Sequence, residues 1–225
     1  MNIVPSFAHT TMAFRVMPAD TYWYFDFISP FAYLQHRQLR ELDNRVKIIP
    51  RPVLFAGLLN HWGQKGPAEI PAKRTFTYEH ATWLGKQAGV ELRFPPSHPF
   101  NPLRALRLSI AMDNEAHVLD AIFNYIWRDG RAVESDIDWE KFTVNLGISD
   151  QASLLGRQDV KDRLRLNTEE AIEAGIFGVP TLIVDGRVFW GQDATQMYID
   201  YLDDPDYFNG PEMQRVRRLE SSAIR

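Results

Sequence analysis

The hydrophobic pattern of the chain changes character within its first fifty residues. Residues 22–28 form a run of aromatic and β-branched residues that only Asp26 interrupts, which predicts a buried strand. Ser29 and Pro30 then predict the start of a helix, because serine is a favoured N-cap and proline suits the first helical position. Apolar residues recur at roughly helical spacing as far as Leu42. Ser29 is therefore expected where a core strand passes into a helix, beside free backbone N–H groups that favour an anion.

The middle of the chain has a helical pattern. Residues 46–53 still predict a strand, which Pro50 and Pro52 restrict to a sheet edge or a strand end, so a βαβ unit opens the fold. From about residue 54 to 160 no strand-like alternation occurs. The stretch between residues 54 and 71 is rich in glycine and proline and predicts a loop with a short helical piece at most. Helices are predicted at residues 72–88, 103–114, 116–129, 139–147 and 151–156.

Strands return near the C-terminus. A helix is predicted at residues 161–174, followed by two short strands around the turn Asp185-Gly186, a strong hairpin signal. A last helix is expected from Ala194 to Leu202. The order βαβ, helical block, αββα predicts an α/β protein, a thioredoxin-like fold split by an all-helical insertion domain. The predicted parts are an N-terminal extension (1–20), a thioredoxin-like domain (21–55 and 161–203), a helical insertion (56–160) and a C-terminal tail (204–225).

Composition narrows the chemistry. The chain has no cysteine, so a disulfide oxidoreductase is excluded and any reactive sulfur must arrive on a ligand. The net charge is −4 and the chain has no long basic block, so nucleic acid is disfavoured as a binding partner. The six histidines show no metal-ligand spacing with carboxylates, so no metal is expected. No apolar run approaches the roughly 20 residues of a membrane span, and residues 1–20 lack a secretory pattern. We therefore expect a cytoplasmic protein.

A second candidate feature lies at the start of the predicted hairpin. Gly178-Val179-Pro180 directly precedes a strand, where an X-Pro bond is ordinarily trans. In thioredoxin-like folds, however, a cis-proline at this position faces the N-terminus of the first helix. The backbone of the preceding residue, here Val179, is then free to pair with a substrate. Taken alone, Ser29 is better explained as a plain helix cap and Pro180 as a trans strand start.

The two features belong to a wider resemblance. Residues 24–34, 67–74, 94–96 and 175–181 together resemble the 2-hydroxychromene-2-carboxylate isomerase family. That family lies within the DsbA-like group of thioredoxin folds and is similar to the kappa-class glutathione transferases. The resemblance extends over about residues 22–202, and the order and spacing of the segments make it specific.

The resemblance implies glutathione as the cofactor. Ser29 matches the serine that replaces the reactive cysteine of the redox relatives, and its hydroxyl would donate to the glutathione sulfur and stabilise the thiolate. Val179 matches the residue whose backbone pairs with the cysteinyl unit, and Pro180 matches the cis-proline. Gln192 and Asp193 fall where the family holds the γ-glutamyl end, and a carboxylate suits its ammonium group.

The chain departs from the family pattern in the region of the second substrate. Where the family reads Lys-x-x-x-Asn, this chain has Asn60 and Gln64, and a family aspartate falls at His80. Gln64 is retained here as a glutathione ligand, whereas Asn60 and Trp62 are assigned to the second substrate. The departures leave the identity of that substrate open.

Three tryptophans outside the first strand allow two interpretations. Trp62, Trp83 and Trp127 suit a hydrophobic core better than a substrate platform. Trp62 is nevertheless assigned to the substrate, because it lies in a glycine-rich loop and is placed to line a hydrophobic pocket.

The resemblance implies a glutathione-dependent isomerase that interconverts 2-hydroxychromene-2-carboxylate and trans-o-hydroxybenzylidenepyruvate, or a similar aromatic degradation intermediate. The family's dimeric habit suggests a homodimer. Three alternatives stay open. A kappa-like glutathione transferase or peroxidase would use the same subsite and consume glutathione. An isomerase or lyase would act on another unsaturated intermediate. A non-catalytic thioredoxin-like module would bind partners without chemistry.

Overall fold

A mixed sheet forms the centre of the computed structural model, which describes residues 20–42 and 45–222. Its strands lie in the order β2-β1-β3-β4. β2 is parallel to β1, β3 is antiparallel to β1, and β4 is antiparallel to β3. The strand bounds are β1 (Thr21–Phe25), β2 (Ile48–Pro52), β3 (Thr181–Val184) and β4 (Arg187–Trp190). The proline-containing strand β2 lies at a sheet edge, as predicted, and Asp185-Gly186 forms the hairpin turn.

Every described element between the sheet's two halves is helical, as predicted. The α-helices are α1 (Pro30–Leu39), α2 (Phe55–Trp62), α3 (Pro71–Gln87), α4 (Leu103–Ala111), α5 (Ala116–Phe123), α6 (Asp136–Asn145), α7 (Gln151–Gly156), α8 (Gln158–Glu173), α9 (Thr195–Asp203) and α10 (Pro211–Val216). Shorter helical turns are η1 (Arg40–Leu42), η2 (Pro67–Glu69), η3 (Asn124–Arg128) and η4 (Tyr207–Asn209).

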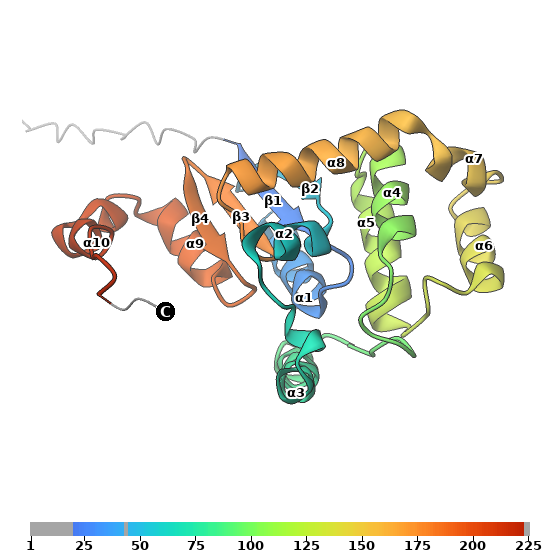
Figure 1. The fold of residues 1–225 in the computed structure, drawn as a ribbon, viewed down its shortest axis with the longest axis horizontal. Helices are drawn as coiled ribbons and strands as arrows, with labels where there is room; N and C mark the ends of the chain where they lie inside the picture. Colours follow the sequence, from blue (N-terminus) through green and yellow to red (C-terminus); the bar gives the residue numbers. More distant parts are fainter. Residues whose placement is uncertain (1–19, 43–44, 223–225) are drawn as a thin grey trace, which may run out of the picture.

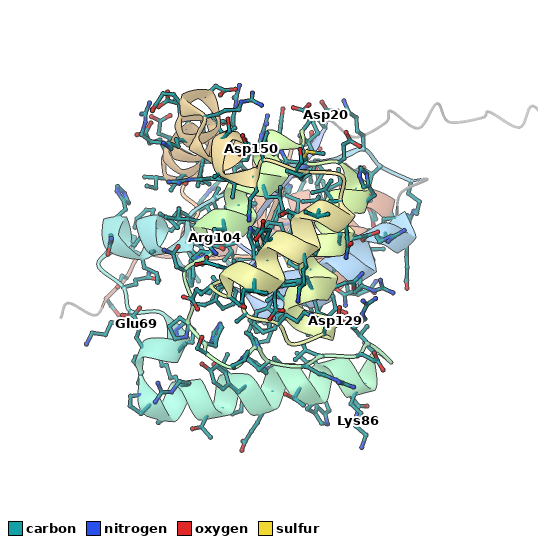
Figure 2. The ribbon with its side chains drawn as sticks, turned by 90° about the vertical axis from the view of Figure 1, so that its right-hand side faces the viewer. Asp20, Glu69, Lys86, Arg104, Asp129 and Asp150 are labelled. Atoms are coloured by element: carbon teal, nitrogen blue, oxygen red, sulfur yellow. The ribbon has the colours of Figure 1, made fainter. Side chains whose placement is uncertain are left out.

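The long helix α8 connects the sheet to the helical block. Figure 1 shows α8 running past the sheet to α4 and α7, with α9 and α10 at the opposite end of the molecule. α8 contacts α2, α4, α7 and β2. α3 forms a separate layer that contacts α1; in Figure 2 it extends along the bottom of the molecule between Glu69 and Lys86. The predicted N-terminal extension lies outside the described residues except for Asp20.

An aromatic cluster joins the sheet to the helical block. Trp23 stacks on Phe25 with ring centroids 4.1 Å apart, and Phe27 lies 4.6 Å from Phe123 of α5. Trp127 belongs to the same buried cluster. Such contacts contribute about 1 kcal/mol each beyond the burial of apolar area. This cluster of buried residues therefore extends through both parts of the fold.

Some local predictions were wrong. The first strand ends at Phe25 rather than continuing to residue 28, because the Asp26 side chain accepts backbone N–H groups and turns the chain. Trp127 is buried as predicted, but Trp83, expected in the core, is 55% exposed. Trp62, which was assigned to the second substrate and not to the core, is 42% exposed. Apolar character alone does not say which side of a helix faces the core.

The predicted C-terminal tail contains structure. Within its described part, residues 204–222, η4 and α10 form. Phe208 is buried and its ring lies 5.5 Å from that of Tyr201 in α9. The first half of this segment is therefore anchored to the hairpin side of the sheet.

Candidate active site

Four chain segments meet at one edge of the sheet. β1 and β2 run in parallel and end together, with Phe25 opposite Pro52. β3 runs the other way, with Tyr24 opposite Thr181, so Pro180 enters the sheet where β1 leaves it. Gly191, directly after β4, donates its backbone N–H to the Pro180 carbonyl at 2.9 Å. The pairing thus brings residues that are 150 positions apart in the chain to a single edge.

Ser29 caps α1 at this edge. Its side chain is buried, and its Oγ accepts the backbone N–H of Ala32 at 3.2 Å. Its own backbone N–H donates to the Asp26 carbonyl at 3.1 Å. Among the described residues, no acceptor takes the Ser29 hydroxyl proton. That proton and the positive end of α1 are therefore available to an anion.

The segment before β3 has an unpaired backbone. The Val179–Pro180 peptide bond is cis, as predicted. Among the described residues, the Val179 N–H and C=O have no hydrogen-bond partner. Gly178 packs against Trp190 so tightly that an added Cβ would lie 2.5 Å from the indole nitrogen, so any larger residue here would force the indole ring to move. A fixed loop thus presents one free donor and one free acceptor next to β1.

Gln192 and Asp193 follow β4 at the same edge. The Gln192 carbonyl accepts the Thr195 hydroxyl at 2.7 Å, which secures the start of α9. Gly191 has a φ of +95°, and an added Cβ there would lie 2.4 Å from a carboxylate oxygen of Asp193. Asp193 is exposed and forms no ion pair with any described residue. Its carboxylate is free to meet a cation.

Asn60, Trp62 and Gln64 lie at the far end of α2. α2 begins at the sheet edge, directly after β2, and Asn60 and Gln64 are exposed near its C-terminus. The Trp62 indole N–H donates to the Ile176 carbonyl at 2.8 Å. Trp62 therefore ties α2 to the loop before Val179, while part of its ring stays exposed. No contact joins these three side chains directly to Ser29.

Asp26 was missed as a site residue. Its carboxylate is fully buried, and its two oxygens accept the backbone N–H groups of Ile28 at 3.1 Å and Phe55 at 2.9 Å. Burial raises its pKa to about 7, although both N–H groups oppose this rise. A single charged residue within an apolar run was the sequence signal. Asp26 therefore changes charge near neutral pH, three residues from Ser29.

Two side chains of the helical block hold the loop that leads to Ser29. Trp127 donates its indole N–H to the Phe27 carbonyl at 2.8 Å. His98 Nε2 lies 2.8 Å from the Ile28 carbonyl, and the Tyr78 hydroxyl lies 2.7 Å from Nδ1. Because a carbonyl only accepts, Nε2 carries the proton, and burial lowers the pKa of His98 and favours the neutral ring. No sequence signal pointed to this role, since His98 lies in a proline-rich connector.

We expect His98→Phe to lower the free energy of unfolding by about 1–3 kcal/mol, because the Ile28 carbonyl would lose its part-buried donor and the Tyr78 hydroxyl would keep only the backbone carbonyl of residue 98. Urea denaturation at pH 7.5 measures the change. His117→Phe is the matched control, since that histidine is exposed on α5, and it should change stability by less than about 0.5 kcal/mol. Equal effects of the two substitutions would contradict the anchoring role of His98.

The arrangement of the sheet, the capped first helix and the cis-proline loop is that of a thioredoxin-like protein, here without a thiol anywhere in the chain. The comparison with known families agrees with this class. The chain belongs to the family of DSBA-like thioredoxin domains, whose model matches residues 22–203. The predicted fold class and family resemblance are thereby confirmed.

The relatives that the chain resembles in sequence include kappa-class glutathione S-transferases and 2-hydroxychromene-2-carboxylate isomerases. The chain is 26% identical over 219 residues to glutathione S-transferase kappa 2 of Caenorhabditis elegans, covering 86% of this chain and 95% of the relative. It is 26% identical over 186 residues to a 2-hydroxychromene-2-carboxylate isomerase of Pseudomonas putida, covering 76% and 88% of the two chains. A solved 2-hydroxychromene-2-carboxylate isomerase superposes with a TM-score of 0.73 at 23% identity, covering 85% of this chain and 98% of that one. These relatives are named as enzymes.

The described residues contain no group of three or more histidine, cysteine, aspartate or glutamate side chains placed to hold a metal ion. None of the described helices is long and apolar enough to cross a membrane.

Proposed function

We propose that this protein is a glutathione-dependent isomerase. Its substrate would be 2-hydroxychromene-2-carboxylate and trans-o-hydroxybenzylidenepyruvate, or a similar aromatic degradation intermediate. The observation that carries the proposal is the uncommitted hydroxyl proton of Ser29 at the N-terminus of α1. A hydroxyl donor and a helix N-terminus both favour a thiolate over a thiol. Since the chain has no cysteine, the thiolate must belong to a ligand.

Three further groups suit the peptide part of glutathione. The free N–H and C=O of Val179 would pair with its cysteinyl unit, as one strand pairs with another. The unpaired carboxylate of Asp193 would hold the γ-glutamyl ammonium group. We assign Gln192 and Gln64 to glutathione binding as well, beside the groups that Val179 and Asp193 would hold. Pro180 fixes the conformation of the loop that presents Val179.

An aromatic second substrate is supported by the surface beside α1. Phe31 occupies the first turn of α1, and its ring lies 5.9 Å from His80 on α3. Phe76 and Trp83 flank His80 on the same helix with ring centroids 5.4 and 6.2 Å away. Both are more than half exposed. This aromatic face complements Asn60 and Trp62 as a surface for a flat, unsaturated molecule.

The proposed reaction needs no net oxidant or reductant. The glutathione thiolate adds to a conjugated carbon of the aromatic pyruvate, so that a C–S bond forms and the π electrons move to the carbonyl oxygen. The former double bond is then single and rotates. The electrons return, the C–S bond breaks, and the thiolate leaves unchanged. The phenol O–H then adds across the ketone C=O: its oxygen bonds to the carbon and its proton goes to the former carbonyl oxygen, which closes the hydroxychromene ring. Ser29 acts by holding the sulfur as a thiolate before addition and after release.

The test is the balance of glutathione during turnover. With a hydroxybenzylidenepyruvate as substrate, we expect isomerisation that requires glutathione while the total thiol concentration stays constant. Chromatography of the products and a thiol assay measure the two quantities. Loss of one thiol per turnover would instead identify the second candidate, a kappa-like transferase, which the similarity to the nematode protein favours. Glutathione binding without any turnover would leave the binding module, and no glutathione binding would overturn the cofactor assignment.

A homodimer and a cytoplasmic location are further parts of the proposal. Size-exclusion chromatography with light scattering tests the first, and cell fractionation tests the second.

A further inference from the structure

An open cavity of about 330 Å³ lies between α4, α8 and the turn into α2. Ligand pockets in proteins begin at about this volume. Its apolar lining is formed by leucines and its polar lining mainly by cations: Leu54, Leu103 and Leu164, and Arg107, Lys161 and Arg165. None of the residues assigned to glutathione or to the aromatic substrate lines it. The cavity therefore requires an explanation of its own.

The cations around the cavity are only partly neutralised. Arg165 pairs with Glu169 at 2.9 Å on the same helix. Arg107 and Lys161 form no ion pair or side-chain hydrogen bond with any described residue, and the Nε of Arg107 is buried without an acceptor. A partly desolvated guanidinium without a counter-charge lowers stability. Glu169 also lines the cavity but is engaged by Arg165, so Arg107 of α4 and Lys161 of α8 converge there without a counter-ion of their own among the described residues.

The Thr168 hydroxyl, which also lines the cavity, is already satisfied. The Thr168 hydroxyl accepts the Leu54 backbone N–H at 3.0 Å and donates to the Leu164 carbonyl at 2.9 Å. The polar end of a ligand would therefore meet charge rather than hydroxyl groups. Its remainder would meet the leucine side chains.

We propose that this cavity binds a small organic anion, a carboxylate with an apolar body. A guanidinium group holds a carboxylate through two parallel hydrogen bonds, and Lys161 adds a second positive charge. The leucines remove the hydrocarbon part from water. Leu54, which lines the cavity, directly precedes Phe55, whose backbone N–H donates to the Asp26 carboxylate. A ligand in the cavity would therefore contact the residue next to a hydrogen-bond partner of Asp26. This proposal is independent of the isomerase activity.

Hexanoate and its uncharged analogue hexanamide are the probes. Calorimetry with the full chain should show saturable binding of hexanoate, about tenfold tighter than that of hexanamide, because only the carboxylate forms charge-assisted hydrogen bonds. Excess glutathione should not displace hexanoate. Equal binding of the two probes, or displacement by glutathione, would overturn the proposal.

Variants assign the binding to this cavity. Arg107→Met should weaken hexanoate binding about tenfold without lowering the melting temperature, because the buried unpaired Nε is removed. A lower melting temperature of Arg107→Met would show that Arg107 stabilises the fold, and would contradict its description as an unpaired charge that is held ready for an anion. Lys161→Met provides a second, partly exposed position and should weaken binding several-fold. Lys141→Met on α6 is the matched control and should leave binding unchanged; parent-like binding by both cavity variants would contradict the assignment.

Discussion

Ser29→Ala should lower glutathione-dependent turnover by about 100-fold, which is the usual cost of removing one donor from a developing anion. The reason is geometric: the Ser29 hydroxyl is the side-chain donor at the N-terminus of α1, and its proton has no other acceptor among the described residues. Without it the glutathione thiol would titrate at a higher pH, since only the helix dipole would still favour the thiolate. Steady-state kinetics and the ultraviolet absorbance of bound thiolate as a function of pH measure both effects.

The control for this substitution is a second helix cap. Ser29→Ala also removes the bond to the Ala32 N–H, a cap that contributes about 1 kcal/mol. Asp150 caps α7 in the same way, accepting the Ser153 N–H at 3.0 Å. Figure 1 shows α7 at the far side of the helical block from the sheet. Asp150→Ala should therefore cost similar stability while turnover and thiol titration stay at the parent values. Ser29→Thr, which keeps the hydroxyl, should retain most activity; if Ser29→Ala did so too, Ser29 would be a cap alone.

Asp26 should make the protein less stable as the pH rises from 4 to 8. Its pKa is about 7 in the folded chain against 3.8 for an ordinary aspartate. The folded state therefore binds more protons than the unfolded state in this range, and stability falls with pH. About three pKa units correspond to about 4 kcal/mol at most. The contribution is fully present below about pH 4 and is lost as the pH passes through 7.

Urea denaturation of the parent and Asp26→Asn between pH 4 and 8 measures this effect. Asparagine keeps one oxygen acceptor for the two backbone donors but does not titrate. Burial lowers the pKa of His98, so that residue makes the protein more stable as the pH rises, the opposite of Asp26. Because His98 is present in both proteins, the difference between the two stability curves isolates the contribution of Asp26. Parallel curves would show that the Asp26 carboxyl titrates alike in the folded and unfolded chains.

The sequence predicted those features that short-range chemistry determines. Ser29-Pro30 marks the start of α1, and Asp185-Gly186 marks the hairpin turn, because each depends on caps and backbone preferences within a few residues. Helical periodicity placed the α-helices between residues 71 and 174 to within a few residues, whereas α2 lies in a stretch predicted to be mainly loop. The absence of cysteine excluded protein-borne thiol chemistry outright. The expected functions of Val179, Pro180, Gln192 and Asp193 came from the family resemblance; composition alone does not predict them.

Tertiary structure decided whatever depends on partners distant in the chain. β1 ends at Phe25 because the Asp26 carboxylate accepts the N–H of Phe55, a donor 29 residues away. His98 became part of the site because folding carried it to the Ile28 carbonyl, 70 positions away. The exposure of Trp83 depends on which face of α3 meets α1. Local periodicity records which residues avoid water, whereas burial, pKa values and unpaired charges such as Arg107 arise only when separate elements pack together.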